Sequence, residues 1–310
     1  MSKVLFSADW HIKLGQKNVP REWQENRFRL MYEKLHNLDF DIHVIGGDIF
    51  DSMPSLEELK LFVDFVLEVD RPTFIFDGNH EATKKGKTFF TILKPILEEL
   101  NENIVVYDKS VSLDYEGVDI IPYTELKTFN PENYKNDILL THVRGEIPPH
   151  VKPEIDLAKL DRWKVVFAGD LHSHTNCQRN IVYPGSPMTT TFHRTPTKTG
   201  VIIFESRTGS YDWVPLKLPQ LIRKTVENED EMVKTDFDHT IYELTGDISK
   251  LSKASKPNPL LDKKVVKRVV DAKIDFSKTD SLEGELLLYL KEVKGIDKSD
   301  SIVSTFNDYI

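Results

Sequence analysis

The sequence predicts a large α/β domain followed by a smaller second domain. Over the first two thirds of the chain, short apolar runs rich in β-branched and aromatic residues alternate with helical patterns. This alternation stops near Pro215 and Pro219. The strands expected in the first domain are residues 4–8, 42–45, 73–76, 138–140 and 165–168. We therefore expect the first domain to span residues 1–216 and the second to span residues 217–310.

Helical patterns follow the first two expected strands. After the first strand, apolar side chains recur at near-helical spacing at Trp23, Phe28, Met31, Leu35 and Leu38. After the second strand, Ser55 and Glu58 form a capping box, and one apolar stripe follows at Leu56, Leu59, Phe62, Val63 and Val66. Both segments are expected to be helices that cross over between parallel strands.

The middle of the chain predicts a second sheet. A tight turn at Glu116-Gly117 indicates a β-meander built from residues 104–107, 111–115 and 118–121. A later hairpin is expected from residues 200–205 and 211–216. In the second domain we expect strands at 240–244 and 265–274, and helices at 281–293 and 301–309.

Composition excludes several classes of protein. With 310 residues, 39% of them hydrophobic and 29% charged, the chain is neither disordered nor fibrous. The single cysteine, Cys177, excludes an intramolecular disulfide and a zinc site made from paired cysteines. No window is apolar enough to span a membrane, and the acidic start at Asp9 does not suit a signal peptide. We therefore expect a cytoplasmic protein with no membrane partner.

The formal charge of -9 disfavours charge-driven binding to nucleic acid. This argument weakens if acidic residues hold divalent cations, because two such ions return a charge of +4 at the site itself. The acidity of the chain therefore does not decide whether nucleic acid is a partner.

Each of the five expected strands of the first domain ends in a polar cluster. The clusters are Asp9-Trp10-His11, Gly46-Gly47-Asp48-Ile49-Phe50-Asp51, Gly78-Asn79-His80-Glu81, Thr141-His142 and Gly169-Asp170-Leu171-His172. Ligands of open α/β sheets bind beyond the carboxyl ends of the strands, so we expect the five endings to converge on one rim. Taken singly, each cluster is typical of a turn, a cap or a buried histidine. Together they predict a binding site.

The side chains of these clusters predict a metal centre. They are carboxylates, imidazoles and one amide oxygen without a thiolate, which suits a pair of divalent ions such as manganese, iron or zinc. Two ions about 3.5 to 4 Å apart activate a water molecule and bind the attacking and leaving oxygens of a phosphoryl displacement. Phosphoester hydrolysis is therefore the chemistry that the sequence favours.

The order of these motifs resembles that of the calcineurin-like metallophosphoesterases. The residues Asp9-Trp10-His11-Ile12 and Gly47-Asp48-Ile49-Phe50-Asp51, and the later Tyr183-Pro184-Gly185-Ser186-Pro187, are similar to those of the SbcD-type DNA double-strand-break nucleases. This resemblance implies a four-layer αββα sandwich with a small C-terminal α+β cap domain. It covers the whole first domain.

The resemblance also implies roles for individual residues. One ion would be held by Asp9, His11 and His172, the other by Asn79, His142 and Asp170, and Asp48 would bridge the two. His80 would bind no metal and would assist departure of the leaving group, as a general acid or a cationic stabiliser. Because imidazole ligands must be neutral to coordinate, we expect activity to fall at acidic pH.

Two residues depart from the family pattern. Asp170 stands where the family usually has the first histidine of Gly-His-x-His, and Glu81 replaces a usual aspartate. A carboxylate can ligate in place of an imidazole, so we expect the site to survive with an altered metal preference. An alternative register that uses His172 and His174 is open, although the strand at 165–168 favours Asp170 and His172.

The implied function is that of a Mn²⁺-dependent DNA exonuclease and endonuclease subunit, similar to bacteriophage versions of the nuclease. It would act with an SbcC-type SMC-like ATPase in DNA end processing, recombination and repair, in the host cytoplasm. The resemblance also implies a homodimer formed through the nuclease domain. Residues 281–310 would dock the ATPase, or would pack on their own cap domain instead. The alternative functions are a phosphatase or cyclic-nucleotide phosphodiesterase, and a catalytically weakened scaffold subunit.

Overall fold

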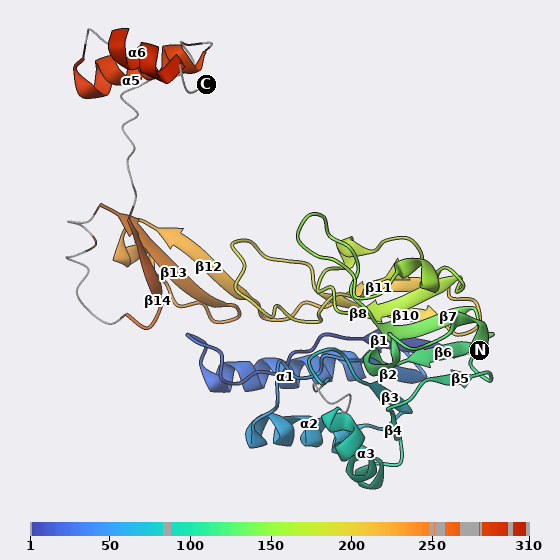
Figure 1. The fold of residues 1–310 in the computed structure, drawn as a ribbon. Coiled ribbons are helices and arrows are strands. Elements are labelled where there is room, and N and C mark those ends of the chain that lie inside the picture. The colour runs from blue at the N-terminus through green and yellow to red at the C-terminus, as the bar shows by residue number, and fades with distance from the viewer. Residues whose placement is uncertain are drawn as a thin grey trace. The chain divides into compact units, whose positions relative to one another are not determined.

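Two β-sheets lie at the centre of the larger part of the chain (Figure 1). The computed structural model describes residues 2–82, 88–247, 251, 258–266, 279, 281–296 and 300–307. In the larger sheet, with strand order β11-β10-β1-β2-β3-β4, the strands are β1 (Lys3–Ser7), β2 (Ile42–Gly46), β3 (Thr73–Phe76), β4 (Ile104–Tyr107), β10 (Gly200–Glu205) and β11 (Tyr211–Pro215). In the smaller sheet, with order β5-β6-β7-β8-β9, they are β5 (Val111–Leu113), β6 (Val118–Ile121), β7 (Ile138–His142), β8 (Val165–Gly169) and β9 (Ile181–Val182).

The two sheets pack on each other through alternate residues of their strands. Val4 and Phe6 of β1 lie in one buried apolar cluster with residues of β7 and β8. The ring centroids of Phe6 and Phe167 are 6.3 Å apart, and those of Phe167 and Phe204 are 4.4 Å apart. Since strand side chains alternate between faces, Leu5 points to the opposite face of the larger sheet. The sheets thus form the two inner layers of a sandwich.

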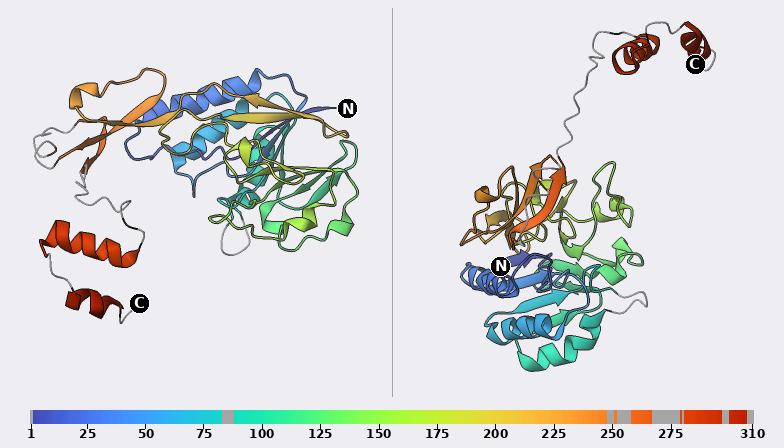
Figure 2. Two further views of the ribbon diagram at one scale, coloured as in Figure 1. Left: turned by 90° about the horizontal axis from the view of Figure 1, so that it is seen from above. Right: turned by 90° about the vertical axis from the view of Figure 1, so that its left-hand side faces the viewer.

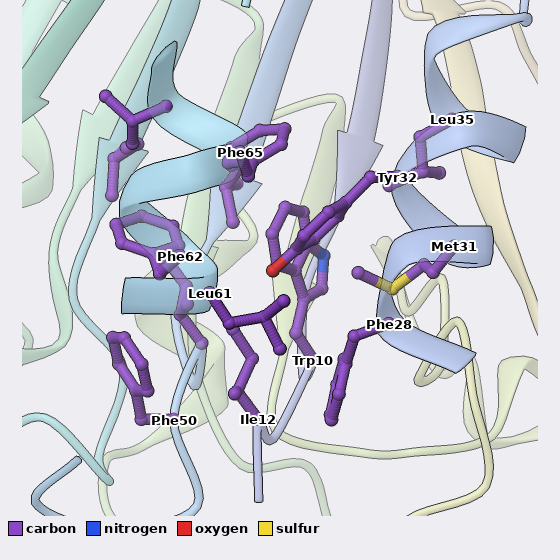
Figure 3. Close-up of a cluster of buried hydrophobic side chains, with 14 of the residues drawn as sticks. Trp10, Ile12, Phe28, Met31, Tyr32, Leu35, Phe50, Leu61, Phe62 and Phe65 are labelled. Atoms are coloured by element: carbon purple, nitrogen blue, oxygen red, sulfur yellow. The ribbon is translucent and has the colours of Figure 1, made fainter. Parts of the chain in front are cut away.

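Three helices cover the outer face of the larger sheet: α1 (Arg21–His36), α2 (Leu56–Glu68) and α3 (Phe89–Leu100). The capping box expected before α2 is present, because Ser55 Oγ accepts a hydrogen bond from the Glu58 N–H and the Glu58 carboxylate accepts one from the Ser55 N–H. Aromatic and aliphatic side chains of α1 and α2 meet over the sheet (Figure 3).

The outer face of the smaller sheet carries short 3₁₀ turns at Tyr123–Glu125, Pro131–Asn133 and Leu157–Leu160. Trp163 fills the core beneath them and donates its indole N–H to Asp119 Oδ2 at 2.8 Å. The predicted α/β sandwich is confirmed. Within the described residues its fourth layer consists of 3₁₀ turns and loops in place of α-helices.

The predicted β-meander at residues 104–121 is wrong in its first strand. β4 pairs in parallel with β3 in the larger sheet, whereas β5 and β6 pair in antiparallel fashion in the smaller one. The reason is α3, which the sequence reading did not identify and which contains Pro95. This helix makes β3 and β4 a parallel crossover pair. The hairpin of β10 and β11 is present as expected.

The chain divides into two compact units, the larger made of residues 1–244 and 256–264 and the smaller of residues 245–255 and 265–310. The larger unit contains both sheets and most of a three-stranded sheet, in which β12 (Leu221–Val226) pairs in parallel with β13 (His239–Gly246), and β14 (Leu261–Val266) lies on the other side of β13. The smaller unit contains α5 (Leu282–Lys294) and α6 (Asp300–Asn307), which pack on each other (Figure 2). The expected strand at 265–274 falls mostly outside the described residues.

The expected division at residue 216 into a nuclease domain and a cap domain remains a prediction. None of the helices in the described part of the chain has an apolar stretch long enough to cross a membrane.

Candidate metal centre

The carboxyl ends of five strands meet at one place, and they come from both sheets. β1, β2 and β3 belong to the larger sheet, and β7 and β8 belong to the smaller one. A buried hydrogen bond of 2.9 Å from His142 Nδ1 to the carbonyl of Gly46 joins the ends of β7 and β2. The site is therefore built across the seam of the sandwich, whereas the sequence reading placed all five endings on the rim of one open sheet.

The turn after β1 directs Asp9 and His11 into the site by burying the residue between them. Trp10 packs between side chains of α1 and α2, with its ring centroid 5.5 Å from that of Tyr32 and 5.2 Å from that of Phe65 (Figure 3). Its indole N–H donates to Ser7 Oγ at 3.0 Å. Asp9 and His11 both have positive φ, of 57° and 46°, so this turn is a strained one.

Neighbouring loops hold this strained turn in place. The N–H groups of Asp9 and His11 donate to the carbonyls of Gly47 and Asp48, at 3.1 and 2.9 Å. Ser186 Oγ donates to the carbonyl of Asp9 at 2.7 Å. The segment 183–187, which resembles the nuclease motif in the sequence, therefore helps to hold the turn that carries Asp9.

Glu81 fixes the loop that presents Asp48. Its buried carboxylate accepts hydrogen bonds from the N–H groups of Asp48 and Gly78, both at 2.8 Å, and of Phe50 at 3.2 Å. Burial and the neighbouring Asp48 raise the pKa of Glu81 to about 7. At Gly47, with φ of 83°, a Cβ would lie 2.5 Å from the backbone of Gly78, so only glycine allows the two loops to approach this closely.

Asn79, His142 and Asp170 form one half of the site, which we call the His142 cluster. The carboxamide atom of Asn79 that faces the cluster lies 2.9 Å from His142 Nε2 and 3.1 Å from both Asp48 Oδ2 and Asp170 Oδ1. Because His142 Nδ1 donates to Gly46, its Nε2 is an acceptor when the imidazole is neutral, which is the form that coordinates a metal. A carboxamide nitrogen in this position has only two hydrogens for three acceptors. A cation satisfies all of them with the amide oxygen turned inward.

Asp9, His11 and His172 form the other half, which we call the His172 cluster. The Nε2 atoms of His11 and His172 are 3.0 Å apart, and one ligand atom from each of the three residues lies within 4.8 Å of the others. His172 Nδ1 lies 3.2 Å from Thr190 Oγ1, whereas the buried His11 Nδ1 has no hydrogen-bond partner. His174 lies elsewhere, with Nδ1 bonded to the Tyr183 carbonyl and its ring stacked on Trp213.

Asp48 lies between the two clusters. Its Oδ2 atom is 3.4 Å from His142 Nε2 and 3.7 Å from His11 Nε2. The three groups of side chains that could hold a metal in the described residues all belong to this site, and Asp48 takes part in two of them. The donors present therefore fit two adjacent cations that share one carboxylate.

The electrostatics of the site favour bound cations. Burial opposes a charge on His142, but Asp48, Asp9 and Asp170 outweigh it and raise the pKa of His142 well above its usual value. Burial, strengthened by His172, lowers the pKa of His11 to about 3, so this imidazole is neutral and free to coordinate. Burial, which outweighs His142, raises the pKa of Asp9 well above its usual value. A divalent cation bound here would offset the repulsion between the carboxylates and the cost of burying their charges.

His80 lies at the exposed edge of the site. Its Nδ1 atom is 2.5 Å from the carbonyl of Asp51, which only accepts, so Nδ1 carries a proton and Nε2 is directed away from that bond. The Nε2 atom lies 3.9 Å from Asp48 Oδ2, and the ring packs edge-on against His11 at 4.7 Å. The structure thus brings together all eight residues that the sequence reading assigned to the site.

The sequence reading missed Arg144. Its Nε and Nη2 atoms donate to Asp170 Oδ2 and Oδ1, both at 3.1 Å. Arg144 follows β7 and Asp170 follows β8, and these strands are parallel neighbours. Arg144 could have been identified only from the pairing of β7 with β8, which a single sequence does not reveal.

The chain belongs to the calcineurin-like phosphoesterase family, whose pattern matches residues 2–176. It is 44% identical over 313 residues to the probable exonuclease subunit 1 of Escherichia phage T5, an alignment that covers 96% of this chain and 95% of the relative. It is 27% identical over 206 residues to the putative phosphoesterase 244L of Invertebrate iridescent virus 6, covering 59% of this chain and 69% of that one.

Among solved structures, TT1561 of Thermus thermophilus is similar, with a TM-score of 0.43 and 12% identity over 69% of this chain and 98% of the other. The family membership supports a metal-dependent phosphoesterase, and the phage relative is named as an exonuclease subunit.

Proposed function

We propose that this protein is the nuclease subunit of a DNA-processing complex and hydrolyses DNA phosphodiesters with two divalent metal ions, Mn²⁺ foremost. The observation that carries the proposal is Asp48 Oδ2, which lies within 3.7 Å of imidazole nitrogens from both clusters. The likeness of nearly the whole chain to a phage protein named as a probable exonuclease subunit supports DNA as the substrate.

The residues of the two clusters would hold one ion each. Asp9, His11 and His172 would hold one, Asn79, His142 and Asp170 would hold the other, and Asp48 would contact both. Bound divalent ions supply Lewis acidity and a water molecule of lowered pKa. Carboxylate, amide and imidazole donors without a thiolate are the set that manganese accepts.

His80 would handle the proton at the leaving group. The Asp51 carbonyl holds the ring through Nδ1, so Nε2 remains to donate a proton to the leaving oxygen when the imidazole is charged. The side chain is partly exposed at the rim, which gives it access to a polymeric substrate. The side chain of Asp51 is held in turn by an ion pair of 2.5 Å with Lys13.

A partner ATPase of the SbcC type would dock on the C-terminal helices. Leu282, Leu287, Tyr289 and Val293 of α5 are exposed, whereas Leu290 is buried. The name of the phage relative as a subunit supports a partner, and the apolar face of α5 offers it a surface. Homodimerisation through the nuclease domain and residence in the cytoplasm of an infected host belong to the same proposal.

The test is hydrolysis of an end-labelled linear duplex by purified protein in Mn²⁺, with EDTA and a His80→Gln variant as controls. We expect cutting that requires Mn²⁺ and is lost in the variant. Intact DNA with metal-loaded protein, with and without the ATPase, contradicts the proposal. Turnover of a chromogenic phosphodiester without DNA cutting supports a phosphatase or cyclic-nucleotide phosphodiesterase, and binding of fewer than two ions supports a scaffold.

A further inference from the structure

Arg144 forms a two-pronged ion pair with a residue of the His142 cluster. Nε donates to Asp170 Oδ2 and Nη2 donates to Oδ1, each at 3.1 Å, so both oxygens of the carboxylate are engaged by one guanidinium. The Asp170 side chain is only 6% exposed, and Asp170 has φ of 101°. The pair therefore fixes a carboxylate that its own backbone holds in a strained conformation.

One of these two oxygens also faces the cluster. Asp170 Oδ1 lies 3.1 Å from the inward atom of the Asn79 amide as well as 3.1 Å from Arg144 Nη2. The Asp170 N–H is fixed separately, since it donates to both carboxylate oxygens of Asp9 at 3.0 and 3.2 Å. Rotation of the carboxylate about its last bond is thus limited by Arg144.

The charge of Arg144 has a second effect. Asp9, Asp48 and Asp170 place three carboxylates in one small, largely buried volume, which is costly unless cations lie nearby. Arg144 supplies one such cation permanently. We propose that Arg144 is a positioning residue that aims Asp170 Oδ1 at the ion held by Asn79 and His142; this inference rests on the proposed function.

The chain offers a matched control. Arg179 makes the same two-pronged contact with Asp161, through Nε at 3.1 Å and through Nη2. The two arginines are similarly exposed, at 45% for Arg179 and 40% for Arg144, but Asp161 is 52% exposed and belongs to neither cluster. A change in metal affinity that follows loss of the Arg144–Asp170 pair, but not loss of the Arg179–Asp161 pair, must therefore arise at the metal centre.

The experiment is a Mn²⁺ titration of the full chain, followed by the electron paramagnetic resonance signal of free Mn²⁺, without DNA. We expect Arg144→Gln to lower the affinity for one of the two Mn²⁺ ions by about 10- to 100-fold and to leave the affinity for the other unchanged. Loss of a residue that orients a metal ligand typically has an effect of this size. Arg144→Lys, which keeps the charge and loses the fork, should lie between Arg144→Gln and wild type. Arg179→Gln should match wild type.

A second background separates positioning from folding. In an Asp170→His protein the imidazole needs no guanidinium, so adding Arg144→Gln should change Mn²⁺ affinity less than about twofold. Equal affinities in wild type and Arg144→Gln overturn the inference, and so does an undiminished Arg144→Gln effect in the Asp170→His background. Fewer than two ions in the wild type overturns the two-metal proposal, whereas two ions in the wild type with no change in Arg144→Gln overturns only the role of Arg144.

Discussion

The two halves of the site are supported to different extents. In the His142 cluster, the Gly46 carbonyl orients His142, Arg144 orients Asp170, and the Glu81 carboxylate binds the N–H of Gly78 beside Asn79. In the His172 cluster, Asp9 accepts hydrogen bonds from the Asp170 N–H. His11 Nδ1 has no hydrogen-bond partner and lies 3.7 Å from Asp51 Oδ1, and His172 Nδ1 has one contact of 3.2 Å to Thr190. Ligands that a second layer orients bind metal with less reorganisation. We infer that the His142 cluster binds its ion first and more tightly.

Asp48→Ala is expected to have the largest effect, because Asp48 lies between both clusters. The variant should lose both ions at micromolar Mn²⁺, and the rate of DNA hydrolysis should fall by on the order of 10³-fold or more. Metal ions stabilise the transition state by several kcal/mol, and each tenfold in rate corresponds to about 1.4 kcal/mol. Metal analysis by mass spectrometry and a labelled-duplex assay measure the two effects. Retention of one ion at full affinity would show that the clusters do not share Asp48.

His80→Gln is expected to separate chemistry from metal binding. Turnover should fall by about 10²- to 10⁴-fold, the contribution of a positioned general acid, while both Mn²⁺ affinities stay within about twofold of wild type. Parallel Mn²⁺ titration and duplex hydrolysis provide the comparison. Loss of an ion in this variant would place His80 among the ligands of one cluster and contradict its assigned role.

Substitution of one histidine from each cluster tests the difference in support directly. In EDTA, His142→Ala should lower the free energy of unfolding by about 2 kcal/mol or more, because the buried Gly46 carbonyl loses its donor. His172→Ala removes an exposed residue whose contacts are the Thr190 hydroxyl and the His11 ring, and it leaves no buried backbone group without a donor, so its effect should stay within about 0.5 kcal/mol. Urea denaturation measures both, and equal losses would remove the basis of the comparison.

A further prediction concerns the pH dependence of stability at His43, which supports the turn carrying Asp9 and His11. His43 Nε2 lies 2.8 Å from Ser7 Oγ, which accepts the Trp10 indole N–H, and burial lowers the pKa of His43 to about 3. Between pH 6.5 and 3 the unfolded chain binds a proton at this residue and the folded chain does not. His43 therefore leaves the free energy of unfolding unchanged above pH 6.5. Below pH 6.5 it lowers that free energy by up to about 1.4 kcal/mol for each unit by which the pH falls.

His43→Gln should therefore flatten the pH dependence of the free energy of unfolding in EDTA between pH 6.5 and 5. An unchanged slope would mean that His43 does not titrate on unfolding.

Hydrophobic patterns predicted the parts of the fold in which local sequence decides the outcome. The runs that became β1, β2, β3, β7 and β8 carry buried apolar residues at nearly every position, which is typical of parallel strands covered on both faces. β4 was assigned to the wrong sheet because a short apolar run does not reveal which strand it pairs with. Strand β12 was missed because Lys224 and Thr225 are exposed and break its apolar pattern.

For the site, motifs at strand ends predicted the residues but not their supports. Asp9, His11 and Asp48 stand in short patterns at strand ends, so their types and spacing were enough to predict that they lie together. The contact of Arg144 with Asp170 depends on β7 lying beside β8, and the contact of Glu81 with Asp48 depends on β2 lying beside β3. Such supports follow from tertiary pairing, which a single sequence leaves open.

The most direct test of the unequal two-metal centre is a crystal structure of the protein soaked in limiting and in excess Mn²⁺, with anomalous scattering recorded at the manganese edge. We predict one peak among Asp48, Asn79, His142 and Asp170 at limiting Mn²⁺, and a second beside Asp9, His11 and His172 in excess. A single peak in excess Mn²⁺, or a His172 cluster that fills first, would contradict this account.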